Sequence, residues 1–202
     1  MLNLLKDSKR SQCILVTLKA LNAEGYQINT VDAEPEYILE KDGKKLNNAY
    51  DVLKCLCAES PLYGTLDAEK KALVDTWLEF CDKELEVPLS VLVWLASGLL
   101  SREQVNTVAE KKARSDIMLL LRRMELRLKE SPFFAGEEMS LADITIACCL
   151  RPLMMTVLGE VERKNFPSVC AWMEKMFSSA LFLETVGETV MLVSAKKGKK
   201  KN

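Results

Sequence analysis

Ser140 and Asp143 have side-chain types and a spacing that could do chemistry. A serine becomes a nucleophile when a base removes its proton, and that base is most often a histidine. The chain contains no histidine, so neither a Ser-His-Asp nor a Cys-His arrangement can form. The same spacing lets an aspartate accept a hydrogen bond from the backbone amide of a serine at a helix N-cap. We therefore interpret the pair as a structural capping box and predict no catalytic residue.

Seven cysteines are the other candidates for chemistry. Cys55 and Cys57 are separated by one residue, and Cys148 and Cys149 are adjacent, whereas cysteine zinc ligands come in spaced pairs. The odd number of cysteines favours free thiols in a reducing compartment. The N-terminus becomes charged too soon for a signal peptide, and the longest apolar run is too short to span a membrane. We predict a cytoplasmic protein with no metal, no cofactor and no transmembrane segment.

Charge is almost balanced over the chain, with 28 basic and 29 acidic residues among 202. The chain as a whole is therefore not expected to attract a polyanion. Basic residues are concentrated near the C-terminal end, at Lys196, Lys197, Lys199, Lys200 and Lys201. This tail is either a solvated linker or a segment that binds nucleic-acid phosphates by releasing counterions. The sequence leaves both alternatives open.

The first sixty residues alternate between strand and helix patterns. Strands are predicted at residues 1–5 and 26–31, and helices at residues 8–23 and 47–59. A hairpin is predicted over residues 36–46, because Asp-Gly at its centre is a strong turn dipeptide. The resulting order is that of a small α/β unit.

Beyond residue 66 the apolar residues recur at helical spacing. Helices are expected at residues 67–85, 89–100, 102–130, 140–158, 166–177 and 182–192. Pro88 is expected to break or kink the chain between the first two. Residues 89–100 are apolar almost all round, which is typical of a buried helix.

Three segments of this helical part resemble proteins of the glutathione transferase fold. They are residues 134–147 (FAGEEMSLADITIA), residues 64–80 (GTLDAEKKALVDTWLEF), and Phe166-Pro167-Ser168-Val169 followed by Trp172. The resemblance is closest to the non-catalytic branch, which includes the gamma subunit of elongation factor 1B. The same branch includes the transferase-like domains of aminoacyl-tRNA synthetases and of multisynthetase-complex scaffold proteins, the tRNA-binding cofactors. The resemblance is specific over residues 63–192 and fainter over residues 1–60.

This resemblance implies a shortened thioredoxin-like α/β subdomain over residues 1–62, an all-α subdomain over 63–192 and a basic tail over 193–202. It implies a non-catalytic docking module of a translation-associated scaffold. Its partners would be other transferase-like domains, in synthetases or in a second copy of the chain, and tRNA bound through the tail and a following domain. The alternatives are an elongation factor 1B gamma-type subunit and an active glutathione transferase.

Several positions depart from the catalytic pattern of the resembled family. Catalytic members hold glutathione with a Ser, Tyr or Cys after the first strand and with a Glu-Ser pair after the hairpin. The second position is here Asn47-Asn48, and Ser8 is interpreted as a helix N-cap rather than a nucleophile, with Ser11 the other candidate. Pro35 stands where the family places its cis-proline, and the segment before it is too short for the family's second helix. Glutathione catalysis is therefore not expected.

A docking surface is expected on the helix that follows the hairpin. Tyr50, Lys54 and Cys57 form a stripe at helical spacing that is expected to face outward, and they are the candidate interface residues. In synthetase-complex relatives an arginine precedes the tryptophan of the next-to-last helix and forms a second interface. Here Ala171 precedes Trp172, so that second interface is expected to be lost.

Overall fold

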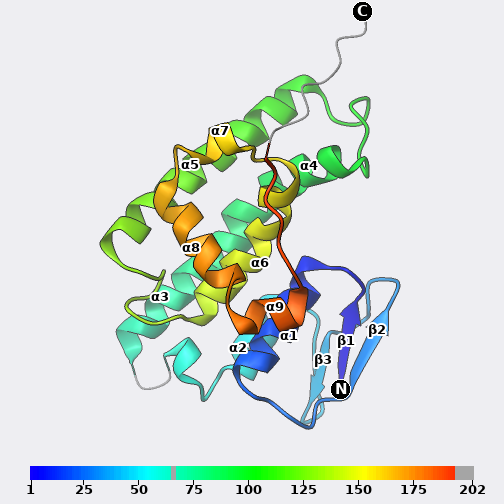
Figure 1. Ribbon diagram of the computed structural model, residues 1–202. Helices are drawn as coiled ribbons and strands as arrows, with labels where there is room; N and C mark the ends of the chain where they lie inside the picture. Colours follow the sequence, from blue (N-terminus) through cyan, green and yellow to red (C-terminus); the bar gives the residue numbers. More distant parts are fainter. Residues whose placement is uncertain (65–66, 194–202) are drawn as a thin grey trace, which may run out of the picture.

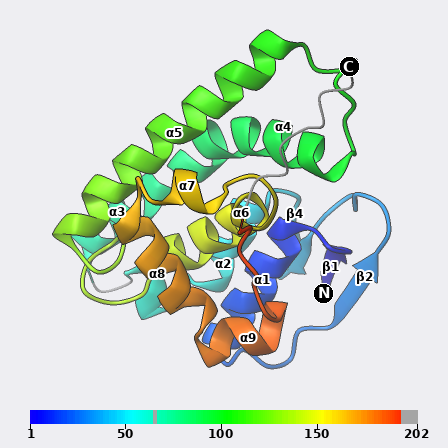
Figure 2. The same ribbon diagram turned by 45° about the horizontal axis from the view of Figure 1, so that its top comes forward.

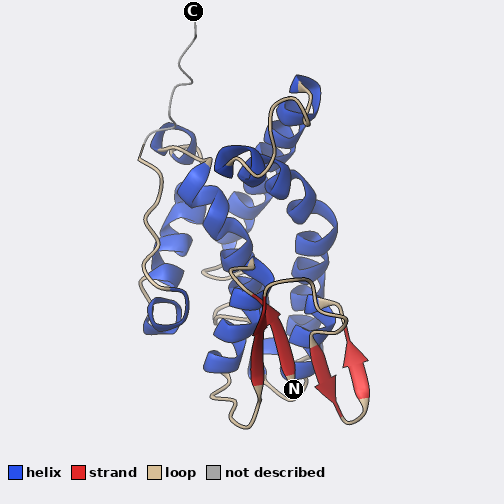
Figure 3. Ribbon diagram, turned by 90° about the vertical axis from the view of Figure 1, so that its right-hand side faces the viewer, coloured by secondary structure: helices blue, strands red, loops and turns tan. Residues whose placement is uncertain are grey.

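The computed structural model describes residues 1–64 and 67–193 (Figure 1). A four-stranded sheet lies at one end of the molecule, and helices make up the rest (Figure 3). The tail lysines Lys196, Lys197, Lys199, Lys200 and Lys201 lie outside the described residues. The predicted fold class, a small α/β region followed by a helical region, is confirmed.

The sheet has the strand order β2-β1-β3-β4. Its strands are β1 (Leu2–Leu5), β2 (Ile28–Val31), β3 (Leu39–Lys41) and β4 (Lys44–Leu46). β1 and β2 are parallel and are connected through helix α1 (Lys9–Ala20), while β3 and β4 form the predicted antiparallel hairpin. Leu2, Leu4 and Leu39 are buried on the side that α1 and α2 cover.

Helix α2 (Ala49–Leu56) follows the hairpin and is capped by Asn48, whose side chain accepts a hydrogen bond of 2.8 Å from the Tyr50 amide. Residues 32–38 connect β2 to β3 without a helix, as the shortness of this segment predicted. The cis-proline implied at Pro35 is wrong, because the peptide bonds of the described residues are trans.

The helical region begins with the short η1 (Pro61–Tyr63) and then α3 (Ala68–Glu79), η2 (Phe80–Leu85) and α4 (Glu86–Ser97). Of the break or kink expected at Pro88, the break is wrong, because the chain stays helical from α3 to α4. η2 is a π-helical segment, in which the Glu86 amide donates to the Cys81 carbonyl, five residues back. Pro88 therefore lies just after this wider turn, and a π-helical turn and a proline are both usual places for a helix to bend.

Helix α4 is also not buried all round, contrary to its apolar composition. Leu89 and Leu92 face the core, but Val87 is 68% exposed and Trp94 is 46% exposed. The helix packs on η2, α5 and α6, which cover part of its circumference. Composition alone could not show that one side of α4 has no covering layer among residues 1–64 and 67–193.

The remaining helices are α5 (Thr107–Glu130), α6 (Leu141–Thr156), α7 (Glu160–Arg163), α8 (Pro167–Phe177) and α9 (Ala180–Val186). α6 lies at the centre of the bundle (Figure 1), and most of its residues are buried. The last helix was expected to run to residue 192 but ends at Val186. Beyond it the chain returns along α6, where the Leu192 amide donates to the Met154 carbonyl at 3.0 Å.

The α/β and helical regions share one apolar core, because α1 packs against both α6 and α9. α8 joins the bundle through Glu125 of α5, whose buried carboxylate accepts from the Ser168 and Val169 amides at the N-terminus of α8. Within residues 1–64 and 67–193, none of the helices has the length and apolar character needed to cross a bilayer.

Candidate functional site

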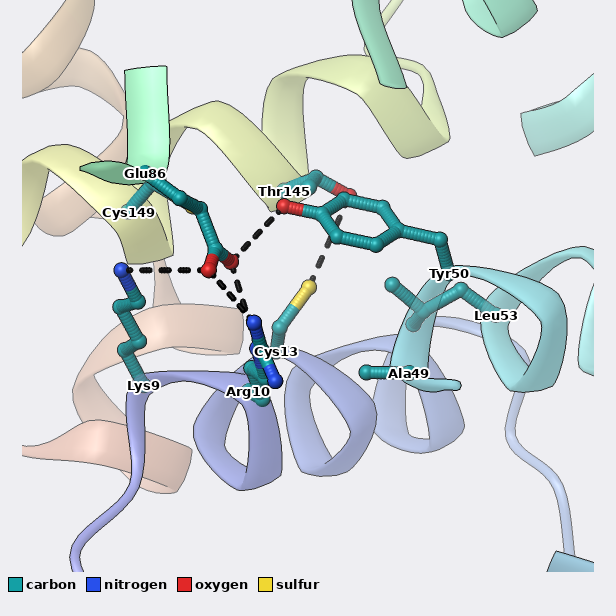
Figure 4. A pocket seen from close by; sticks show the side chains of 9 residues that line it. All are labelled: Lys9, Arg10, Cys13, Ala49, Tyr50, Leu53, Glu86, Thr145 and Cys149. Atoms are coloured by element: carbon teal, nitrogen blue, oxygen red, sulfur yellow. Dashed lines mark hydrogen bonds and ion pairs between the residues drawn. The ribbon is translucent and has the colours of Figure 1, made fainter. Parts of the chain in front are cut away.

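The candidate site is the seam between the α/β region and the helical region (Figure 4). Its walls come from α1 and α2 on one side and from α4 and α6 on the other. A cleft between two such regions is a usual place for a ligand. The groups that line it therefore decide what it could bind.

Glu86, the first residue of α4, is the centre of the polar contacts in the seam. Its carboxylate accepts hydrogen bonds of 2.6 Å and 3.3 Å from the guanidinium of Arg10 and of 2.9 Å from the Tyr50 hydroxyl. The Lys9 ammonium lies 3.7 Å from the same carboxylate. Figure 4 shows these three side chains converging on Glu86 from α1 and α2. One carboxylate therefore ties both helices of the α/β region to the helical region.

Local sequence explains why the cations lie there. Ser8 caps α1 by accepting a hydrogen bond of 3.2 Å from the Arg10 amide, so Lys9 and Arg10 occupy the first turn of the helix. Cations are unfavourable at this positive end of a helix dipole. The Glu86 carboxylate compensates for that placement and satisfies both side chains.

The pKa shifts follow from burial and from these contacts. Burial alone would raise the pKa of Glu86, but the hydrogen bond from Arg10 and the charge of Lys9 outweigh it, and the pKa is lowered. The hydrogen bond to Glu86 raises the pKa of Arg10. Burial raises the pKa of Tyr50, so its hydroxyl stays protonated and acts as a donor. The cluster is a stable ion pair with a neutral phenol.

The space left in the seam is small, with a cavity of about 10 Å³. A volume of this size holds about one water molecule and no more. Ser8 is engaged as a helix cap, and Ser11 is buried at 9% exposure. Neither serine lines this cavity.

The expectation that Tyr50, Lys54 and Cys57 all face outward is wrong for two of them. Tyr50 is 8% exposed because its ring enters the seam, and Cys57 is fully buried at the end of α2. Burial raises the pKa of the Cys57 thiol to about 12, so it stays protonated. Lys54 is half-buried at the surface, where its ammonium pairs with Asp75 of α3 at 2.7 Å. The error arose because α2 is covered on more than one side.

Sequence reasoning did not single out Glu86, Lys9 or Arg10. A signal for them did exist, because two adjacent cations in the first turn of a capped helix conflict with the helix dipole. Such a conflict indicates a carboxylate supplied from elsewhere in the fold. Its identity depends on packing between residues more than seventy positions apart, which spacing cannot show.

Ser140 and Asp143 form a capping box at the start of α6. The Asp143 carboxylate accepts from the Ser140 amide at 2.9 Å and from the Ser140 hydroxyl at 2.6 Å. It also accepts from the Phe134 amide at 3.0 Å and from the Trp172 indole at 3.1 Å. Both side chains are fully buried, so the pair is structural and not exposed to a substrate.

With this geometry known, comparison with known proteins identifies the family. Residues 80–180, half of the chain, match the family described as "Glutathione S-transferase, C-terminal domain". The chain belongs to the glutathione S-transferase C-terminal domain family.

Curated relatives of this transferase-family chain include two elongation factor 1-gamma proteins. The one from Danio rerio is 31% identical over 120 residues, which cover 59% of this chain and 26% of the relative. The one from Bos taurus is 30% identical over 120 residues, which cover 59% of this chain and 27% of the relative. The chain therefore spans about a quarter of the length of these relatives. They confirm the predicted resemblance to the elongation factor 1B gamma branch.

Solved structures show that this transferase-family chain shares its fold with both enzymes and a translation factor. The transferase-like domain of elongation factor 1-gamma from Saccharomyces cerevisiae has a TM-score of 0.78 at 17% identity, over 95% of this chain and 96% of that one. Glutathione transferase F7 from Populus trichocarpa has a TM-score of 0.76 at 19% identity, over 92% of this chain and 98% of that one. At these identities the similarity establishes the fold alone.

Proposed function

We propose that this chain is a non-catalytic docking domain of the elongation factor 1-gamma type, acting in a cytoplasmic, translation-associated assembly. The observation that carries the proposal is the closed seam. Glu86 occupies the space between the two regions with Lys9, Arg10 and Tyr50, and the cavity beside them has the volume of about one water molecule.

The curated relatives support the gamma-type function over the synthetase-scaffold function that was expected first. Both relatives described above are elongation factor 1-gamma proteins. Partners of this type would be other subunits of a translation elongation factor. Docking would act by effective concentration, since holding two proteins together makes their second encounter intramolecular.

Of the three candidate interface residues, Lys54 keeps a place in the proposal. It lies where α2 meets α3, beside Asp75 and Lys71, and these side chains are partly or fully exposed. A partner would reach this surface without disturbing the core. Tyr50 and Cys57 support the same region from inside. The tail lysines would add a salt-dependent attraction to RNA phosphates such as those of tRNA.

Two measurements test the proposal. A conjugation assay with glutathione and chlorodinitrobenzene is expected to give no turnover above the uncatalysed rate. Purification of the tagged full chain from its own cells is expected to recover elongation-factor subunits, in amounts that fall for Lys54→Glu. Lys19→Glu is the matched control, because Lys19 is exposed on the side of α1 next to α9 and pairs with Glu184 there.

Turnover that is lost in Ser8→Ala or Ser11→Ala would contradict the non-catalytic part of the proposal. Recovery of the chain as a monomer free of elongation-factor subunits would contradict the docking part. A salt-titrated gel shift with tRNA, with and without residues 195–202, tests the tail separately.

A further inference from the structure

The outward side of α5 carries exposed apolar residues in one line. Val108 is 75% exposed, Leu119 is 60% exposed and Leu126 is 63% exposed. They are eleven and seven residues apart, close to whole numbers of helical turns, so they lie on one side of the helix. From Val108 to Leu126 this line is about 27 Å long. Figure 2 shows α5, in green, as an outer helix of the bundle.

Polar residues continue the same line at spacings of three or four. The α5 outer face, as we define it, consists of Val108, Lys111, Ser115, Leu119, Arg122 and Leu126, all of which are exposed. Single exposed apolar residues on a surface are ordinary. An ordered row of them, with a small residue near its centre, is the surface that a second helix packs against.

Charge on the α5 outer face is positive and unpaired. Elsewhere on α5 the cations are engaged, because Arg114 pairs with Glu162 at 3.2 Å, and Arg123 pairs with Glu84. For Lys111 and Arg122, by contrast, no carboxylate in the described part of the chain lies within ion-pair distance. Two free cations therefore alternate with three exposed apolar side chains.

We propose that the α5 outer face binds an amphipathic helix of another protein, one that presents leucine-like side chains and carboxylates on the same side. Apolar side chains of that helix would cover Leu119 and Leu126, and its carboxylates would neutralise Lys111 and Arg122. A second copy of this chain does not fit. A two-fold contact on this face would place its cations against the same cations of the copy.

This inference rests on the proposed docking function but concerns a face that shares no residue with the Lys54 region. The two can therefore fail separately. Purification of the Lys54→Glu variant, with the expected loss of elongation-factor partners, tests the Lys54 region. Binding of a defined acidic helix to α5 tests the second, and it needs no knowledge of the natural partner.

The probe is a fluorescein-labelled synthetic helix of about five turns, built from Ala, with Leu at spacings of seven and eleven. A Glu stands three or four residues from each Leu, so that both kinds of side chain lie on one side. Its matched control has Lys in place of every Glu. Fluorescence anisotropy with the full chain is expected to give saturable binding of the acidic helix. The basic helix is expected to bind at least about tenfold more weakly, because charge complementarity is reversed.

Variants of α5 locate the binding. Leu119→Glu is expected to weaken the acidic helix about tenfold or more, since it removes apolar contact area and adds a repelling charge. The double variant Lys111→Glu/Arg122→Glu is expected to reverse the preference, so that the basic helix binds better. Lys54→Glu should bind like the unmodified chain. Circular dichroism checks that each variant is folded. We expect that they are, because the substituted positions are exposed.

Equal binding of the acidic and basic helices would overturn the proposal, and so would binding that Leu119→Glu leaves unchanged. Sedimentation of the unmodified chain and of Leu119→Glu tests whether a second copy of the chain binds this face instead. If the chain is a dimer and this variant makes it monomeric while the acidic helix fails to bind, the α5 outer face is a self-interface and the proposal is wrong.

Discussion

The hydroxyl of Tyr50 donates a hydrogen bond of 2.9 Å to the carboxylate of Glu86. The two residues belong to α2 and α4, and both are 8% exposed. The same carboxylate holds Arg10 of α1, so one acidic group contacts both helices of the α/β region. In this chain the seam is a structural connection between its two regions.

Removing Glu86 should therefore weaken the whole fold. Glu86→Ala leaves Lys9 and Arg10 facing an emptied seam, and we expect it to lower the free energy of unfolding by about 3 kcal/mol. Urea denaturation measures the loss. Glu184→Ala is the control, since its pair with Lys19 is exposed on both sides, and it should cost far less. Equal losses in the two variants would show that the seam contributes no more than a surface pair.

Asp143 is the second buried carboxylate on which the fold depends. Asp143→Ala leaves the buried donors of Phe134, Ser140 and Trp172 without an acceptor. We expect the free energy of unfolding to fall by about 3 kcal/mol or more, measured by urea denaturation. Ser140→Ala removes the hydroxyl but keeps the backbone contact, and should cost about 1 kcal/mol. A Ser140→Ala loss as large as that of Asp143→Ala would contradict this assignment of roles.

Acid should weaken the contact between α2 and α3. The Asp75 carboxylate accepts from the Tyr63 hydroxyl at 2.7 Å and pairs with Lys54 and Lys71. Burial alone would raise the pKa of Asp75, but these donors outweigh it and lower the pKa from 3.8 to about 2. A lowered pKa in the folded chain gives stabilisation that is present above the unfolded value of 3.8 and is lost as the pH falls through about 2.

The test is Asp75→Asn, compared with the unmodified chain by thermal denaturation over a range of pH. The variant should be less stable at neutral pH, and the difference should shrink as the pH falls from about 4 to about 2. Part of the pH dependence remains in the variant, because the pKa of Glu86 is lowered as well. A difference that stays constant down to pH 2 would contradict the prediction.

Gly64 and Gly98 form a matched pair for testing backbone strain. Both have positive φ, at 76° and 79°. A Cβ on Gly64 would lie 2.7 Å from the Lys71 amide nitrogen, whereas a Cβ on Gly98 would meet nothing within 4 Å. Gly98→Ala is expected to cost about 1 kcal/mol, the usual penalty of a left-handed alanine. Gly64→Ala should cost distinctly more. Urea denaturation measures the free energy of unfolding of both variants. Equal losses would mean that the backbone at Gly64 shifts easily to make room for the methyl group.

Local patterns in the sequence predicted much of the fold. The capping box at Ser140 and the hairpin at Asp42-Gly43 each depend on residues that are neighbours in the chain. Such features are set by hydrogen bonds and dihedral preferences within a few residues. They were therefore accessible before any packing was known.

Burial and the site depended on packing, and there the predictions were less successful. Tyr50 and Cys57 lie on a side of α2 that looked like the outside, but another layer covers it. Trp94 belongs to a helix whose composition indicated burial all round, but it is 46% exposed among the described residues. Helical spacing gives the faces of a helix, and only the neighbouring elements determine which face meets solvent.

The π-helical segment η2 connects α3 to α4 within the helical region. It holds one more residue in its turn than an α-helix would, directly before Glu86. Because the wider turn takes up the extra residue, deleting one residue from η2 would restore a regular α-helical turn and leave Glu86 facing Arg10 and Tyr50. A one-residue deletion within the regular helix α3 would instead rotate the chain beyond it by about 100°. A one-residue deletion should therefore be tolerated far better in η2 than in α3.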